Sequence, residues 1–213
     1  MAEAEITKAM IVNWALVELG LAPNFSIDDE TPLGARVEIF WPRTMARAFG
    51  LHDWIFCRQT FLLTRQEAKP INGWTFGFDL PGGIIGPPLK LTSDPGCEVP
   101  LRDFAIEGKT VFTNEQAAYA RCKVYLEPAD WPPQFTDAFA VLLAAYLAVP
   151  LTQDSELAAN KEAAAIGTPS QGGAGGMFGR LIAQDRAASP VGSPAVSDAL
   201  SGGRFTTDWH GRY

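Results

Sequence analysis

Apolar residues at helical spacing mark both the beginning and the later part of the chain, whereas the middle alternates apolar and polar residues as strands do. The first segment, 6–20, is apolar around nearly its whole circumference and has Thr7 near its start. A helix of that kind is buried on more than one side. In a chain of 213 residues, we expect one of these sides to face a neighbouring subunit.

A second helix is predicted from Thr31 to about Phe49, after a polar linker. Thr31 supplies an N-cap and Pro32 stands at the first helical position. Pro42 falls inside the segment and has no amide hydrogen, so we expect a kink or a break near Trp41.

Three arginines fall on a similar face of this second helix: Arg36, Arg43 and Arg47. The simpler interpretation is that they form ion pairs with Glu38 or with other carboxylates. The functional interpretation is that they line a channel or contact another subunit.

Residues 54 to about 127 show the two-residue period of strands, interrupted by glycine and proline. The predicted strands are 54–63, 89–92, 104–106, 110–112 and 117–126. Glu107-Gly108 suits a tight hairpin between the third and the fourth of them. The segment 73–88 is rich in glycine, proline and aromatic residues, and we expect a long loop or a loosely paired arm there.

The last predicted strand alternates cleanly between two faces. One face carries basic and aromatic residues: Tyr119, Arg121, Lys123 and Tyr125. Such a face can stack nucleic-acid bases and contact phosphates. The alternatives are a solvated face partly covered by aromatic rings, or a subunit interface.

After Pro132-Pro133 the helical period returns. A strong apolar face runs through 135–147, and Pro150 is expected to end this helix. Thr152 is expected to cap a further helix that reaches about Ile166.

The C-terminal part of the chain is rich in glycine and proline. A glycine-rich stretch at 167–179 is expected to break the helices, with a short helix at about 177–188. From residue 189 we expect an extended or disordered arm. Its aromatic residues, which suit anchoring on a partner unless they are there by chance, are Phe205, Trp209 and Tyr213.

The predicted fold class is α+β and mainly helical: a helix bundle with an inserted small β-sheet domain and an extended C-terminal arm. The expected parts are N-terminal helices (1–53), a β-rich insertion (54–130), C-terminal helices (131–188, with the glycine-rich break at 167–179) and the arm (189–213).

Charge and composition narrow the function classes. The net charge of −7 and the pI of about 4.8 argue against general affinity for nucleic-acid phosphates. Three cysteines without a CxxC pair fit reduced thiols, and two histidines are too few for a metal site with them. There is no run of about 18 uncharged apolar residues, so we expect no membrane span. The N-terminus lacks the basic start of a secretory signal.

Motifs for bond-making chemistry are not found. The run Gly172-Gly173-Ala174-Gly175-Gly176 lacks the Lys-Ser/Thr of a phosphate loop and suits a hinge better. Asp28-Asp29-Glu30 suits a solvated loop better than a cation site. His52-Asp53 has no identifiable nucleophile and suits a turn. We therefore expect no enzyme activity, no cofactor and no metal.

Several short pieces follow one another in a fixed order between residues 6 and about 165. They are 15–20 with Pro23, Trp41-Pro42-Arg43 through 54–58, Asn72-Gly73-Trp74 leading to Leu80-Pro81, the strand pair at 104–114, Tyr125, and Trp131-Pro132-Pro133 through 134–140. In this order they resemble the head-to-tail adaptor proteins of tailed bacteriophages, the group that includes tail tubular protein A of short-tailed phages.

The resemblance implies a structural virion protein in the neck between head and tail, present in the host cytoplasm during assembly. It implies a ring, commonly of twelve subunits, between the portal and the tail nozzle or tail tube, with a central channel through which DNA passes without specific binding. It also implies that the C-terminal arm embraces the portal. The glycine-rich stretch at 167–179 departs from the family pattern, in which a helix more often continues.

Two other functions stay open at this point. One is a tail-completion or nozzle-type component whose partner is the tail tube. The other is a nucleic-acid-binding protein that uses the face of Tyr119, Arg121, Lys123 and Tyr125, against which the net charge argues.

Overall fold

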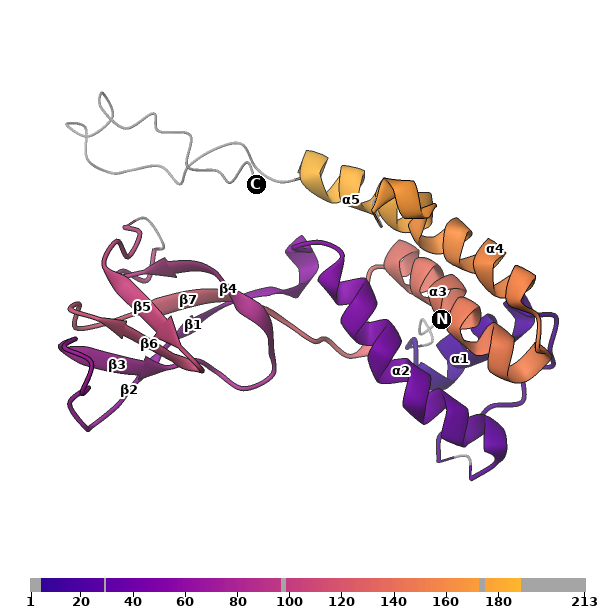
Figure 1. The fold of residues 1–213 in the computed structure, drawn as a ribbon, viewed down its shortest axis with the longest axis horizontal. Helices are drawn as coiled ribbons and strands as arrows, with labels where there is room; N and C mark the ends of the chain where they lie inside the picture. Colours follow the sequence, from indigo (N-terminus) through magenta and orange to yellow (C-terminus); the bar gives the residue numbers. More distant parts are fainter. Residues whose placement is uncertain (1–4, 29, 97–98, 173–174, 189–213) are drawn as a thin grey trace.

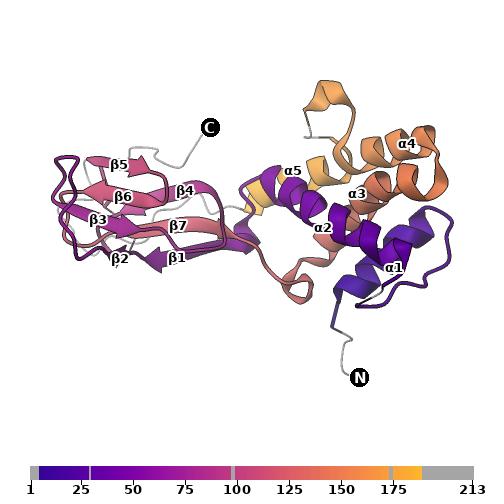
Figure 2. The same cartoon turned by 60° about the horizontal axis from the view of Figure 1, so that its bottom comes forward.

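Helices gather at one end of an elongated molecule and strands at the other (Figures 1 and 2). The computed structural model describes residues 5–28, 30–96, 99–172 and 175–188. This part contains five α-helices and two small antiparallel sheets, so the α+β class is confirmed. The aromatic arm residues Phe205, Trp209 and Tyr213 lie outside the described residues.

Helix α3 is the centre of the helical end. It contacts each of the other four helices, and eleven of its twenty residues are buried. The helices are α1 (Lys8–Glu18), α2 (Pro32–Gly50), α3 (Pro133–Thr152), α4 (Ser155–Ile166) and α5 (Gly176–Ala188). Because α3 is apolar on almost every side, its sequence requires neighbours all round.

Helix α3 is also long and apolar enough, by composition, to cross a membrane. Its best 18-residue window has a mean hydropathy of 1.7, but 67% of that window is buried inside the protein. A core helix passes the same test, and burial among four other helices explains this one.

The predicted N-cap of the second helix, Thr31, is confirmed, and Thr7, predicted near the start of the first helix, is its N-cap. The hydroxyl of Thr7 accepts a hydrogen bond from the amide of Met10, and that of Thr31 accepts one from Gly34. The predicted break near Trp41 is wrong, because α2 runs without interruption through Pro42. Buried residues lie on both sides of Pro42, so packing on the core holds the helix together despite the lost hydrogen bond.

The end of α3 and the start of α4 differ from the prediction. Pro150 does not end α3; the helix continues to Thr152 and stops at Gln153, whose φ is 59°. The N-cap of α4 is Asp154, whose carboxylate accepts a hydrogen bond from the amide of Leu157 at 2.8 Å. Thr152 cannot cap α4 because its hydroxyl still lies within α3 and donates to the Ala148 carbonyl at 2.8 Å.

The strands form two antiparallel sheets with the orders β1-β7-β4 and β2-β3-β6-β5. Their bounds are β1 (Arg58–Leu62), β2 (Thr64–Arg65), β3 (Phe76–Asp79), β4 (Ile84–Thr92), β5 (Phe104–Glu107), β6 (Thr110–Thr113) and β7 (Tyr119–Val124). The predicted hairpin between 104–106 and 110–112 is confirmed as β5–β6.

The prediction of a long loop at 73–88 is wrong, since this segment contains β3 and the first part of β4. Its glycines and prolines, which are rare in strands, were the reason for predicting a loop. β4 accommodates Gly86-Pro87-Pro88 by a register shift between Ile85 and Lys90, and proline is tolerated because β4 is an edge strand. Residues Ile55–Cys57, expected in a strand, form a single 3-10 turn instead.

Apolar side chains form two separate cores. The smaller core lies between the two sheets and includes Phe78, Val111 and Ala120. The larger core fills the helical end and continues to the point where the strands begin. There, the Trp54 indole donates a hydrogen bond to the Ala48 carbonyl at 3.0 Å, which ties the end of α2 to the start of the β region.

Candidate interaction surfaces

The described residues contain no group of three or more His, Cys, Asp or Glu side chains that could hold a metal ion. Cys57 and Cys122 are buried free thiols. Burial raises the pKa of the Cys57 thiol to about 11, so this thiol stays protonated and is a poor nucleophile.

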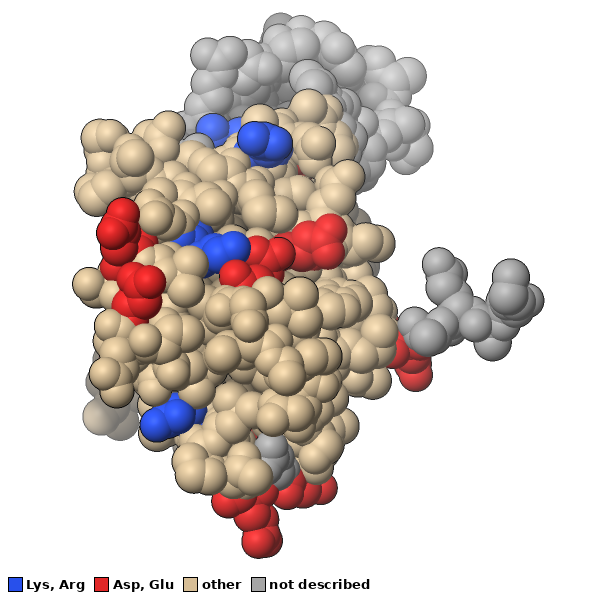
Figure 3. Space-filling view, turned by 90° about the vertical axis from the view of Figure 1, so that its right-hand side faces the viewer, with Lys and Arg blue, Asp and Glu red and all other residues tan. Residues whose placement is uncertain are grey.

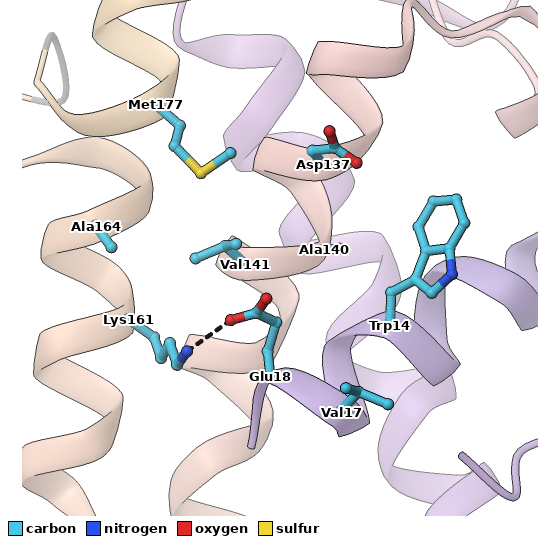
Figure 4. Close-up of a pocket in the computed structure, with 9 residues that line it drawn as sticks. All are labelled: Trp14, Val17, Glu18, Asp137, Ala140, Val141, Lys161, Ala164 and Met177. Atoms are coloured by element: carbon cyan, nitrogen blue, oxygen red, sulfur yellow. Dashed lines mark hydrogen bonds and ion pairs between the residues drawn. The ribbon is translucent and has the colours of Figure 1, made fainter. Parts of the chain in front are cut away.

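A groove of about 550 Å³ runs over α3, between α1 on one side and α4 with α5 on the other (Figure 4). Its floor is formed by Ala140 and Val141 of α3. The remaining lining residues come from the flanking helices and from the first turns of α3: Trp14, Val17, Glu18, Asp137, Lys161, Ala164 and Met177. The groove is mainly apolar, with charged groups at its rim.

One ion pair joins the two walls of the groove. Lys161 of α4 lies 2.6 Å from a carboxylate oxygen of Glu18 of α1 (Figure 4). Exposed pairs of this kind contribute about 0–1 kcal/mol to stability. The pair links α1 to α4 across the groove.

Helix α1 shows why the groove is a candidate interface. Ile11, Val12 and Leu16 are buried, whereas Trp14 is 36% and Val17 57% exposed on the other side. The apolar circumference of this helix is therefore only partly covered within one chain. That a neighbouring subunit covers the rest stays a prediction.

The end of the molecule that the helices form is covered mainly by uncharged residues (Figure 3). Asp and Glu form several separate groups on this face, and Lys and Arg occupy smaller areas. Such a face suits a protein partner better than a polyanion.

The arginines of α2 do not pair with Glu38, so that interpretation is wrong: Glu38 is paired with Lys8 at 2.6 Å. No described residue forms an ion pair with Arg36, Arg43 or Arg47 in this structure. Arg36 is half-buried, while the other two are exposed.

Arg43 and Arg47 lie near Tyr146 of α3. The Arg43 guanidinium lies 5.0 Å from the centre of the Tyr146 ring, in a cation–π contact. Burial raises the pKa of Tyr146, and the charges of Arg47 and Arg43 oppose that rise. Two exposed cations beside a half-buried ring suit an interface, and their role as channel or subunit contacts stays a prediction.

The predicted basic and aromatic face of β7 is assembled only in part. Tyr119 and Arg121 are half-buried on it, but Lys123 is buried rather than solvated. The Lys123 ammonium lies 2.9 Å from the Asp53 carboxylate and within 3.5 Å of the Phe49 and His52 carbonyls. Lys123 therefore links β7 to the end of α2.

Tyr125 does not extend the face either. It follows the last residue of β7, and its ring packs edge-on against Phe49 with centroids 5.4 Å apart. Phe49 also contacts the rings of Phe56, Trp131 and Phe135, and these rings form an aromatic cluster at the junction between the helices and the β region. A period-two pattern cannot reveal such contacts.

Two cations that the sequence did not single out lie on the same sheet face. In the register of the sheet, Arg58 of β1 is opposite Lys123, and Lys90 of β4 is opposite Arg121. The alternation of 117–126 gave no information about partner strands, so only the register identifies this cationic face.

His52 and Asp53 do not act together as a pair. His52 instead donates from Nε2 to the Asp185 carboxylate of α5 at 3.1 Å, and the same carboxylate accepts the Ile55 amide at 3.3 Å. Asp185 thereby fixes α5 to the start of the β region. No sequence signal connects residues 133 positions apart.

Titration of His52 provides a pH prediction. Burial lowers the pKa of His52 below its usual 6.5, and the nearby Asp185 charge opposes this shift only in part. Folding therefore favours the neutral imidazole. Burial of neutral His52 makes its full contribution to the free energy of unfolding above pH 6.5, and this contribution is lost as the pH falls from 6.5 through the lowered pKa of the folded protein. NMR titration should show that one of the two histidines has a pKa below 6.5.

The variant His52→Gln assigns the signal in that titration. A native pKa above 6.5 for His52 would contradict the prediction and would mean that the Asp185 charge outweighs burial.

No protein-family model matches the chain, and no curated protein matches it either.

Proposed function

We propose that this protein is a structural virion component, a head-to-tail adaptor that forms a ring between the portal and the tail of a bacteriophage and leaves a central channel for DNA. The observation that carries the proposal is the groove over α3, an apolar surface that one chain leaves open on its most apolar helix. The ordered resemblance at 6–165 supports the ring setting, and a closed ring of identical contacts would cover the groove in every copy.

The proposal includes the finer architecture. The helices form a bundle, residues 54–130 are an insertion in it, and 189–213 are an arm that reaches the portal with Phe205, Trp209 and Tyr213. No catalytic step is assigned to any residue.

The adaptor function is tested by mixing the full chain with assembled portal rings and recording native mass spectra or electron micrographs. We expect rings of the chain on the portal. Val17→Asp, which places a charge on the groove wall, should lower ring occupancy roughly tenfold or more, because burying an unpaired carboxylate is costly. The protein should stay folded, since Val17 is 57% exposed.

Ile71→Asp is the matched control, because Ile71 is fully exposed and lies away from the groove. It should assemble like the unchanged chain. A chain that ignores assembled portal rings would refute the adaptor function. Equal assembly of Val17→Asp and Ile71→Asp would remove the groove from the contact. A chain that ends at Ala188 and still binds the portal fully would refute the role of the arm.

A further inference from the structure

Helix α2 turns an uncharged strip of residues to solvent, whereas the outer side of a surface helix is normally polar. The strip, which we call the α2 ridge, lies within about 40° of one line along the helix at about 100° per residue. Its five exposed residues are Ala35, Ile39, Pro42, Ala46 and Gly50. Ile39 is 66% exposed and is the one large side chain among them. A second chain can therefore approach α2 closely and cover Ile39.

Arginines border the α2 ridge along the edge nearest α3. They lie within about 20° of one line along the helix: Arg36, Arg43 and Arg47. None of the three forms an ion pair with a described residue. On the other edge, Glu38 is neutralised by Lys8 at 2.6 Å. The surface that fits this helix is therefore apolar opposite Ile39 and carries a carboxylate opposite an arginine.

The groove over α3 has both of these properties. Its floor of Ala140 and Val141 is apolar, and the Asp137 side chain stands beside it on the first turns of α3 (Figure 4). Asp137 is exposed and forms no ion pair with a described residue, whereas Glu18 is paired with Lys161. An amphipathic helix lays its apolar side into such a groove and places its charges at the rim.

The α2 ridge and the groove lie on opposite sides of α3. Phe139 of α3 packs against Trp41 of α2, with ring centroids 5.0 Å apart. At about 100° per residue, Phe139 points about 160° away from Val141 on the groove floor. The ridge faces away from α3, because buried residues occupy the other side of α2: Val37, Thr44 and Ala48. A single chain therefore cannot bring the two surfaces together.

We infer that the α2 ridge of one copy docks in the groove of the next copy, with Ile39 over the floor and Arg43 near Asp137 of that copy. The inference rests on the proposed ring and names the surface that covers its groove. A second copy fits better than nucleic acid, because a polyanion would meet the arginines and leave Ile39 without an apolar contact. Two different surfaces on opposite sides of one chain repeat from copy to copy and close into a ring when the rotation allows it.

A charge on the α2 ridge tests the contact in the full chain with assembled portal rings. Ile39→Asp should lower ring occupancy roughly tenfold or more, because docking would press a carboxylate against an apolar floor. The chain should stay folded, since Ile39 is 66% exposed. Ile71→Asp makes the same change at a fully exposed residue of the β region and should assemble like the unchanged chain.

A charge exchange tests the pairing of the two surfaces. Arg43→Glu alone and Asp137→Arg alone should each lower ring occupancy roughly tenfold or more, because each places like charges together. The double variant Arg43→Glu with Asp137→Arg should restore occupancy. Arg102→Glu is the matched control, since Arg102 is exposed in the β region and forms no ion pair with a described residue.

Disulfide trapping locates the contact directly. In a Cys97→Ser background, Ile39→Cys is combined with Val17→Cys on one wall of the groove, or with Ala164→Cys on the other. Rings oxidised with diamide should give a ladder of covalently linked copies on a gel without reductant. Ile39→Cys with Ile71→Cys should give none. Intact rings without a ladder from either groove pair would overturn the inference.

The outcomes separate the inference from the function. Normal rings from Ile39→Asp, or a folded double variant that stays defective, overturn the docking contact and leave the adaptor function intact. Failure of the unchanged chain to form rings on the portal overturns both. Intact rings with a loss of salt-dependent DNA binding in Arg43→Glu would make the arginine edge a nucleic-acid surface and overturn the inference.

Discussion

Replacing Phe135 by alanine is expected to lower the free energy of unfolding by about 3–5 kcal/mol, the range for truncating a buried phenylalanine. Phe135 is 1% exposed and lies at the centre of the aromatic cluster at the junction. Its ring contacts aromatic residues of α2, of the segment that follows α2, of α3 and the segment before it, and of α5: Phe49, Trp54, Phe56, Trp131, Phe139 and Phe178. The centroid distances are between 4.9 and 6.5 Å.

The effect is large because these neighbours cannot collapse into the space together. They belong to segments held in place by separate contacts, so the cavity would persist and its cost would add to the lost burial. Urea unfolding followed by tryptophan fluorescence measures the change. Phe104→Ala is the control: Phe104 is 41% exposed on the edge strand β5, and its loss should cost less than about 1 kcal/mol. Equal effects of the two variants would contradict the central role of the cluster.

Replacing Gly176 by alanine is expected to lower the free energy of unfolding by about 2–4 kcal/mol, because two costs coincide. The φ of Gly176 is +60°, a left-handed conformation that disfavours side chains. An added Cβ would also press against the carbonyl oxygen of Ala164 and would lie 2.7 Å from that of Ala165. Both obstacles are backbone atoms of α4, so relief requires α5 to move.

Gly172→Ala separates the two costs. Gly172 has a φ of +59°, but an added Cβ would meet no atom within 4 Å, so only the backbone term of about 1 kcal/mol applies. Thermal unfolding of both variants gives the difference, which is the cost of the close approach. Equal melting temperatures for the two variants would show that α5 moves away from α4 freely.

Sequence periodicity predicted most of the helices and strands. It was wrong where glycine or proline, which usually end such elements, lies inside one. Pro42 predicts a kink or a break, but α2 is continuous through it and has buried residues on both sides of it. The glycines and prolines of 73–88 concealed β3 and the start of β4, because a bulge on an edge strand tolerates them.

The candidate surfaces were less predictable because they depend on contacts distant in sequence. Lys123 fits the alternation of β7, yet its ammonium is buried by residues 49–53 at the end of α2. The glycine-rich stretch reads as a hinge, whereas Gly176 closely approaches α4. The groove combines residues of four helices, and the sequence predicted only one part of it, the exposed apolar side of α1.

The register of β1 and β7 places the two ends of the strand-bearing part next to each other. The chain leaves the helices at Arg58 and returns to them just after Lys123, and these two residues are directly opposite in the sheet. Their Cα atoms are therefore only about 5 Å apart. A short turn joining these positions would close the helical end without the strands, and a different module with neighbouring termini would fit the same gap. Exchange of the strand-bearing module would need to replace the polar contacts that Lys123 and Arg58 make with residues 49–53 at the end of α2.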